Sequence, residues 1–145
     1  MKHVLAAILT FLAVLSTRTA MADDVLVLRE GWALQSSALV TASGEAISGD
    51  AFSVEGWHAT SVPATLLAAL VADGTYPDPY IGDNITKIPG SKPGLWLVMD
   101  EDSPFYPSWW YRTSFEVPAS WTGKRLTLHV DGINYRANVW LNGKR

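Results

Sequence analysis

The fold is decided by three stretches near the end of the chain: Trp109-Trp110-Tyr111-Arg112-Thr113-Ser114-Phe115, then Asp131-Gly132-Ile133-Asn134-Tyr135, then Val139-Trp140-Leu141-Asn142-Gly143-Lys144-Arg145. Asn-Gly after an alternating apolar run is the strongest short-range sign of a two-residue type I′ turn, because both central residues take a positive φ. A hairpin needs a second strand, and only Lys144 and Arg145 follow the turn. We therefore expect a hairpin here, in a domain that is incomplete at its C-terminus.

Apolar and polar residues alternate along three segments before this turn. Tyr111–Val117, Arg125–Val130 and Ala137–Leu141 each place their apolar side chains on one face. Val25–Leu28 and Trp32–Ser36 also have the composition of strands. Three strands at roughly ten-residue spacing, with turn residues between them, predict an antiparallel sandwich or barrel.

One short helix is predicted against this all-β background. Pro63 suits the first helical position, and Gly74 can end the helix after Asp73. The apolar stripe between them consists of Leu66, Leu67, Leu70 and Val71. The following segment, residues 75–107, carries six of the eight prolines, and a loop of this length in a compact domain is more often functional than idle.

The first 22 residues have the features of a secretory signal peptide. Lys2 precedes an apolar run from Val4 to Leu15, and Ala20-Met21-Ala22 forms a small-x-small cleavage site. The run is too short to span a bilayer, which takes about 20 apolar residues. An uncleaved anchor or a buried first helix is the alternative. We expect cleavage after Ala22, a secreted or periplasmic location with no membrane attachment, and a partial domain over residues 23–145.

Charge and cysteine content exclude several partners and chemistries. Removal of Lys2 and Arg18 with the signal peptide leaves nine basic and fourteen acidic residues, a formal charge of −5, so nucleic acid is not an expected partner. The absence of cysteine excludes disulfides, thiol catalysis and thiolate metal sites. Seven tryptophans follow the signal peptide, and we expect most of them in the core. They are Trp32, Trp57, Trp96, Trp109, Trp110, Trp121 and Trp140.

No set of residues forms a self-sufficient active site. Asp100-Glu101-Asp102 is the acidic cluster, but neighbouring side chains on a loop splay apart and do not face each other across a scissile bond, so we interpret it as a solvated turn. His58 fits a capping or packing role better than that of a general base, and His129 lies on the outward face of a predicted strand. Gly-x-Ser-x-Gly and phosphate-binding glycine loops are missing. We expect no metal site and no cofactor.

Six short motifs follow one another in a definite order. They are Gly31-Trp32 with Gln35-Ser36-Ser37, Trp57 with Val62-Pro63-Ala64-Thr65, Tyr76-Pro77-Asp78-Pro79-Tyr80 with Gly82 and Asn84, Trp109-Trp110-Tyr111-Arg112-Thr113, Asp131-Gly132-Ile133-Asn134-Tyr135, and Trp140-Leu141-Asn142-Gly143. Together they resemble the N-terminal sugar-binding jelly-roll domain of glycoside hydrolase family 2, and most closely its exo-β-D-glucosaminidase and β-mannosidase branch. The resemblance implies an all-β, galactose-binding-like jelly-roll β-sandwich with one short helix, incomplete at its C-terminus.

The same resemblance implies a retaining glycosidase whose catalytic part lies outside this chain. In that family an immunoglobulin-like sandwich and a (β/α)₈ barrel follow the jelly roll, and the barrel carries two catalytic glutamates, one directly after an asparagine. Asn84, Asn134, Asn138 and Asn142 each precede a residue other than glutamate. We therefore expect no catalytic residue here and no activity from the chain alone. The expected partners are a carbohydrate substrate and the missing sandwich and barrel.

Three residues are candidates for substrate contact. In related β-galactosidases the asparagine of an Asp-Gly-Val-Asn stretch reaches the sugar subsite, and Asn134 matches that position. An amide both donates and accepts hydrogen bonds, which suits vicinal hydroxyls, although support of the turn is an equally good role. Trp109 and Trp110 either line the cleft or pack in the core of the β-sandwich. Arg112 is expected to pair with a carboxylate across the sheet.

Two other functions stay open. A free-standing carbohydrate-binding module could also be a tryptophan-rich jelly roll. It would have to fold alone, and a sandwich with missing strands exposes an apolar sheet edge. A secreted interaction domain without sugar affinity is the third possibility.

Overall fold

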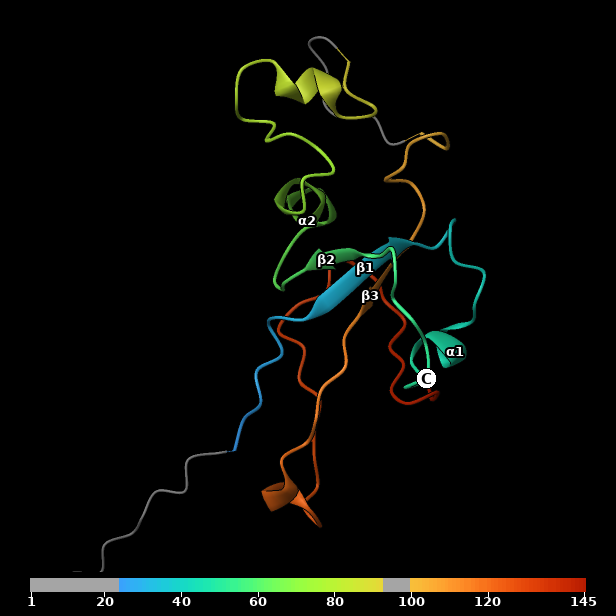
Figure 1. The fold of residues 1–145 in the computed structure, drawn as a ribbon, viewed down its shortest axis with the longest axis vertical. Coiled ribbons are helices and arrows are strands. Elements are labelled where there is room, and N and C mark those ends of the chain that lie inside the picture. The colour runs from blue at the N-terminus through green and yellow to red at the C-terminus, as the bar shows by residue number, and fades with distance from the viewer. Residues whose placement is uncertain (1–23, 93–99) are drawn as a thin grey trace, which may run out of the picture.

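The computed structural model describes residues 24–92 and 100–145. The predicted signal peptide over residues 1–22, together with Pro93 and Trp96, falls outside these ranges. In chain order the elements are β1 (Trp32–Ser36), α1 (Gly44–Ile47), β2 (His58–Thr60), α2 (Leu66–Ala72), the 3₁₀ turn η1 (Asn84–Lys87), β3 (Trp109–Arg112) and the 3₁₀ turn η2 (Ala119–Trp121) (Figure 1).

A three-stranded antiparallel sheet in the order β2-β1-β3 lies at the centre of the molecule (Figure 1). Leu34 of β1 stands opposite His58 of β2 on one side and Tyr111 of β3 on the other. The predicted strand Trp32–Ser36 is confirmed. The predicted strand Tyr111–Val117 is wrong in its bounds, because pairing with β1 begins two residues earlier and ends at Arg112.

One face of the sheet packs against α2. Leu34, Ala69 and Leu70 form the buried cluster, and Leu34 is 0% exposed. Partly buried apolar groups surround the cluster, namely Ala64, Leu66, Tyr76, Phe105, Trp109 and Tyr111. Because Trp109 and Tyr111 alternate with their neighbours along β3, Trp110 and Arg112 face the opposite side of the sheet.

Helix α2 confirms the predicted helix with one change at its start. Thr65 is the N-cap, and its hydroxyl accepts a hydrogen bond from the Ala68 amide at 3.2 Å. Pro63 therefore lies two residues before the cap and not in the first turn. Asp73 is the C-cap, and Gly74 follows with φ of 84°, a left-handed conformation that glycine adopts without steric strain.

Helix α1 is a second helix, which the sequence analysis did not predict. The Ser43 hydroxyl caps it by accepting from the Ala46 amide at 3.3 Å. Arg112 donates from Nε to the Ile47 carbonyl at 2.9 Å and from Nη2 to the Gly49 carbonyl at 3.1 Å. The expectation that Arg112 pairs with a carboxylate is thus wrong, because its guanidinium satisfies carbonyls that the end of a helix leaves free.

The predicted type I′ turn is confirmed at the end of the chain. Asn142 and Gly143 have φ of 48° and 79°. Leu141 and Lys144 exchange two backbone hydrogen bonds, of 2.8 and 3.0 Å. The turn lies against α1, where the Gly143 amide donates to the Ser48 hydroxyl at 2.9 Å.

We name residues 113–139 the C-terminal arm. It leaves the sheet after β3, runs outward to η2 and returns toward α1 (Figure 1). The Thr113 hydroxyl donates to the Gly31 carbonyl at 3.0 Å, and Lys124 pairs with Asp24 at 2.5 Å. Many of its apolar side chains are exposed: Phe115, Val117, Leu126, Leu128, Val130, Ile133, Tyr135 and Val139.

Three predicted strands are wrong in the described parts of the chain. Val25–Leu28 and Arg125–Val130 form no strand, and in Ala137–Leu141 the pairing is the single bridge from Leu141 to Lys144. Alternation selects a face, but a ladder also needs a neighbouring strand to supply hydrogen bonds. Across residues 24–92 and 100–145, short strands and coil dominate with few helices, which is consistent with an all-β domain.

Candidate functional site

Asn134 lines an open hollow of about 500 Å³ between the arm and the segment that enters α2. Its lining residues are Pro63, Ala64, Thr65, Gly132, Ile133 and Asn134. A hydrogen bond from the Val62 amide to the Arg29 carbonyl at 2.8 Å joins the entering segment to the residues that precede β1. The arm supplies the other wall. The structure therefore brings Asn134 to the start of α2, a juxtaposition across about half of the sequence.

The chemistry of this hollow is mixed. Pro63 and Ile133 present apolar surface, and the Asn134 amide offers two donors and an acceptor. The Thr65 hydroxyl already accepts from the Ala68 amide as the helix cap. Asn134 is exposed, so its amide is accessible to a ligand.

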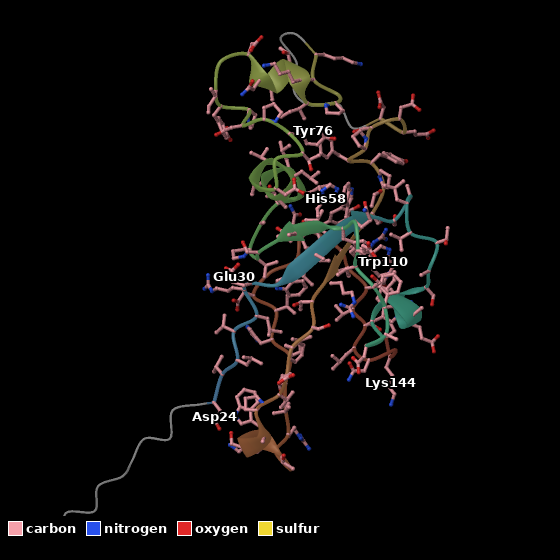
Figure 2. The ribbon with its side chains drawn as sticks, in the orientation of Figure 1. Asp24, Glu30, His58, Tyr76, Trp110 and Lys144 are labelled. Atoms are coloured by element: carbon pink, nitrogen blue, oxygen red, sulfur yellow. The ribbon has the colours of Figure 1, made fainter. Side chains whose placement is uncertain are left out.

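Trp109 and Trp110, the other predicted contact residues, lie apart from the hollow and on opposite faces of the sheet. Trp109 packs against the buried cluster beneath α2, and its Nε1 donates to the Pro104 carbonyl at 3.3 Å. Trp110 lies on the α1 side (Figure 2), and its ring centroid is 5.4 Å from that of Trp140. Neither residue lines the hollow beside Asn134. Both are half-buried, and their contact with substrate stays a prediction.

Trp110, Trp140, Gly44 and Arg145 form a cluster on the α1 side of the sheet, which we name the Trp110 cluster. It also contains an unpaired polar atom. Within the described residues, Nε1 of Trp110 is buried without a hydrogen-bond partner. Trp140 packs so closely on Gly44 that a Cβ at that position would overlap its ring. The Arg145 guanidinium carbon lies over the Trp140 ring, 5.7 Å from its centroid. These contacts make the cluster a packing unit between β3, α1 and the terminal hairpin.

A hydrogen-bonded group that the sequence analysis did not predict consists of His58, Asp73 and Thr75. His58 Nδ1 lies 2.5 Å from Asp73 Oδ2, and Asp73 Oδ1 accepts from the Thr75 amide at 2.9 Å and hydroxyl at 2.6 Å. Burial would raise the pKa of Asp73, but the hydrogen bonds from Thr75 and His58 outweigh it and lower that pKa below its usual value. The contact joins β2, through His58 (labelled in Figure 2), to the C-cap of α2.

This position gives His58 the packing role that the sequence favoured. Its ring also lies 6.2 Å from that of Trp109. The signal in the sequence is the pattern Asp-Gly-Thr at the end of a helix, where Asp and Thr hydrogen-bond locally. The distance of 15 residues between His58 and Asp73 gives no sequence signal of their contact.

The remaining acidic groups are spread over the surface. Asp100-Glu101-Asp102 forms an exposed turn, as expected. A second open hollow of about 530 Å³ is lined by Asp50, Ser114, Phe115 and Glu116. Over residues 24–92 and 100–145, no three His, Asp or Glu side chains gather in a way that could hold a metal ion.

The sequence analysis placed His129 on the outward face of a strand, and this prediction is wrong. No strand forms around His129 in the described arm. Its Nε2 lies 3.2 Å from Asp131 Oδ1, and both side chains are exposed. The pair is therefore a local surface contact. Among the described helices, none is long and apolar enough to cross a bilayer.

Sequence comparison identifies the family. The profile of the glycosyl hydrolase 2 galactose-binding domain-like family matches residues 32–145. This range includes the sheet, both helices, the hollow beside Asn134 and the terminal turn. The chain belongs to this family, and the resemblance inferred from its motifs is confirmed.

The relatives agree with the expected branch. The chain is 35% identical over 79% of its length to an exo-beta-D-glucosaminidase of Streptomyces avermitilis, and 32% identical over 79% to an exo-beta-D-glucosaminidase of Amycolatopsis orientalis. A mannosylglycoprotein endo-beta-mannosidase of Lilium longiflorum is 32% identical over 61% of the chain. These matches span 11%, 10% and 8% of the three relatives. No solved structure gives a significant match.

Proposed function

We propose that this chain is the sugar-facing, non-catalytic part of a secreted retaining glycosidase of the exo-β-D-glucosaminidase or β-mannosidase type. The observation that carries the proposal is the 35% identity to an exo-beta-D-glucosaminidase over 79% of the chain. The order of the motifs supports membership of this part of the enzyme. No asparagine in the chain is followed by a glutamate, as the catalytic glutamate of the family is, which favours a non-catalytic role. Export would use the signal peptide over residues 1–22.

Two observations support a larger parent enzyme. The chain spans about a tenth of the length of its glucosaminidase relatives. The arm also leaves alternating apolar side chains exposed, Leu128 by 53% for example, and an apolar strand face is normally covered by another element. In the proposed enzyme, further strands cover these faces and complete a jelly-roll sandwich, which is followed by an immunoglobulin-like sandwich and a catalytic barrel.

Asn134 is the proposed substrate contact. Its amide is accessible in an open hollow and can bind two neighbouring hydroxyls at once, one as a donor and one as an acceptor. In the parent enzyme it would hold the sugar while the barrel glutamates act on the glycosidic bond. Loss of a hydrogen bond to a neutral hydroxyl weakens transition-state binding by about 1 kcal/mol, which is roughly fivefold in kcat/KM.

The test is enzymatic. The complete protein that contains this chain is assayed with p-nitrophenyl β-D-glucosaminide, β-D-mannoside and β-D-galactoside, and NMR follows the anomeric configuration of the first product. We expect hydrolysis of the glucosaminide or the mannoside with retention, and no hydrolysis by residues 23–145 alone. Asn134→Ala should lower kcat/KM, whereas Asn138→Ala, on the same arm but outside the hollow, should not. Absence of hydrolysis by the complete protein would reject the proposal.

The signal peptide is tested separately. Mass spectrometry of the exported protein should find Asp23 as its first residue. A protein that keeps residues 1–22, or that stays inside the cell, would contradict the proposed location. The proposed enzymatic activity would be unaffected by that result.

The carbohydrate-binding module is the second candidate, and the open hollow beside Asn134 is the observation in its favour. It predicts that residues 23–145 melt cooperatively in calorimetry and bind oligosaccharides at micromolar concentration. The exposed apolar faces of the arm count against it, because a free-standing domain would cover them.

A further inference from the structure

Asn142 and Gly143 combine a reactive side chain with an accessible backbone nitrogen. Asparagine is one of the thermolabile residues of proteins. Its side-chain carbonyl carbon can be attacked by the backbone nitrogen of the following residue, and glycine has no side chain to crowd that nitrogen. Asn142 is exposed, so water reaches the group. This dipeptide therefore has the chemistry of a deamidation site.

The other asparagines of the chain lack this pairing. Asn84, Asn134 and Asn138 precede isoleucine, tyrosine and valine. Each of these residues has a bulky side chain beside the nitrogen that would attack. Deamidation is thus favoured at Asn142, and Asn138 in the C-terminal arm is an internal reference for its rate.

The turn itself holds the attacking nitrogen in place. Asn142 has φ of 48°, and two backbone hydrogen bonds between Leu141 and Lys144, of 2.8 and 3.0 Å, fix the ends of the turn. The first central residue of a type I′ turn has ψ of about 30°. To close a ring between the Gly143 nitrogen and the Asn142 side chain, the peptide plane between them must turn well away from this orientation. The folded turn therefore opposes the reaction.

A hydrogen bond to another element holds the same nitrogen. The Gly143 amide donates to the Ser48 hydroxyl at 2.9 Å, and Ser48 is the C-cap of α1. The hydroxyl donates in turn to the Glu45 carbonyl at 3.3 Å, so the helix fixes its position. Figure 1 shows the end of the chain beside α1. Rotation of the peptide plane at Gly143 requires the loss of this hydrogen bond, which is worth about 1 kcal/mol.

We propose that Asn142 is a deamidation site and that the hydrogen bond from Gly143 to Ser48 restrains it. Solvent hydroxide removes the proton of the Gly143 nitrogen, which forms a bond to the side-chain carbonyl carbon of Asn142. The side-chain nitrogen takes a proton from water and leaves as ammonia. Water then opens the cyclic imide at one of its two carbonyls, which gives aspartate or isoaspartate. This inference is independent of the proposed glycosidase.

Isoaspartate at this position would change the packing on α1. It lengthens the backbone by a methylene group, so Leu141 and Lys144 no longer stand opposite each other. Deamidation also adds a negative charge to a turn that lies against Glu45. Both changes favour release of the hairpin, and with it of the Trp140 ring that packs on Gly44. The site therefore couples a slow covalent change to the packing between the hairpin and α1.

The experiment measures the deamidation rate of the full chain at mildly alkaline pH. Tandem mass spectrometry of proteolytic peptides determines aspartate and isoaspartate at position 142 over time, and a synthetic peptide of residues 139–145 gives the unrestrained rate. We expect the peptide to react faster than the chain. Ser48→Ala should accelerate the reaction in the chain about fivefold, which corresponds to about 1 kcal/mol. Asn138 should stay unmodified over the same time.

Two variants separate the hydrogen bond from general stability. Ser48→Thr keeps a hydroxyl acceptor and should react at the rate of the parent chain. Thr65→Ala removes the cap of α2, which costs about 1 kcal/mol of stability without touching the hairpin, and it should also keep the parent rate. Near-ultraviolet circular dichroism before incubation shows whether each variant has folded like the parent chain. In the aged parent chain this tryptophan signal should fall in proportion to the isoaspartate content.

The inference is wrong if the parent chain deamidates at Asn142 as fast as the free peptide, or if Ser48→Ala keeps the parent rate. It is also wrong if Thr65→Ala accelerates the reaction as much as Ser48→Ala, because general stability would then be the source of the protection. A tryptophan signal that stays constant as isoaspartate accumulates would overturn the coupling to α1.

Discussion

The sheet region and the C-terminal arm have similar sequence patterns and different packing. We use the name sheet region for β1, β2, β3 and α2. In it Leu34 and Leu70 are 0% and 2% exposed, whereas Leu126 and Leu128 of the arm are 49% and 53% exposed. Alternating apolar residues choose the face of a strand, but burial also requires a second element against that face. The sheet region has α2 as this element.

The difference has an energetic meaning. Full burial of a leucine side chain stabilises a fold by about 1.5–3 kcal/mol. Leu34 and Leu70 contribute such amounts to the sheet region, while Leu126 and Leu128 contribute a fraction of them in the arm. The sheet region should thus determine most of the stability of this chain.

The largest effect is expected from Leu70→Ala. It removes a fully buried side chain of α2 that packs on Leu34 of the sheet, and it should lower the free energy of unfolding by about 2–5 kcal/mol. Leu128→Ala in the arm is the control, with an expected change of less than about 0.5 kcal/mol. Urea unfolding followed by circular dichroism measures both. Equal losses would mean that the arm is packed as well as the sheet region.

Gly44→Ala tests the contact where the chain returns from the arm to α1. A Cβ at this position would overlap the Trp140 ring, so the ring must move and the loss should be about 1–3 kcal/mol. Gly132→Ala is the matched change in the arm, since its added Cβ meets no atom within 4 Å. Near-ultraviolet circular dichroism should change for Gly44→Ala and stay constant for Gly132→Ala. An unchanged tryptophan signal in both would argue against the packing of Trp140 on α1.

Thr65→Ala removes the cap of α2 and should lower the free energy of unfolding by about 1 kcal/mol. Thr122 in the arm also makes a local hydrogen bond, to the Ala119 carbonyl at 2.8 Å. Thr122→Ala should have a smaller effect, because η2 is not packed against the sheet. Thermal melts of the two variants provide the comparison. A larger loss for Thr122→Ala would contradict the division of the molecule into these two regions.

The smallest effect concerns pH. The lowered pKa of Asp73 means that its contribution to stability is present above the unfolded pKa of about 3.9 and is lost as pH falls through the folded pKa. Asp73→Asn should therefore reduce the difference in unfolding free energy between pH 6 and acid. Urea titrations at several pH values give the slopes.

Several features of the fold could be predicted from local sequence. The strand Trp32–Ser36, the helix at Leu66–Ala72 and the Asn142-Gly143 turn each depend on neighbouring residues, and each is confirmed. The four-residue helix α1 was missed because its contacts come from far away in the sequence, through Arg112 and Gly143. The strands expected in the arm failed for a related reason, since their partners are not encoded in their own alternation.

The candidate site could likewise be predicted only in part from the sequence. The motif around Asn134 identified one wall of the hollow but not the other, because Pro63, Ala64 and Thr65 come close to it only in the folded chain. The sequence grouped Trp109 and Trp110 as adjacent aromatics. Alternation along β3 separates them onto two faces, each with its own packing partners.

The hydrogen bond from Gly143 to Ser48 joins residues that are 95 positions apart. A ribosome adding 5–20 residues per second needs on the order of ten seconds to make the intervening chain. Throughout that interval α1 exists without the hairpin that lies against it, and Gly44 has no indole ring to contact. The packing around α1 is thus among the last in the chain to be completed during translation.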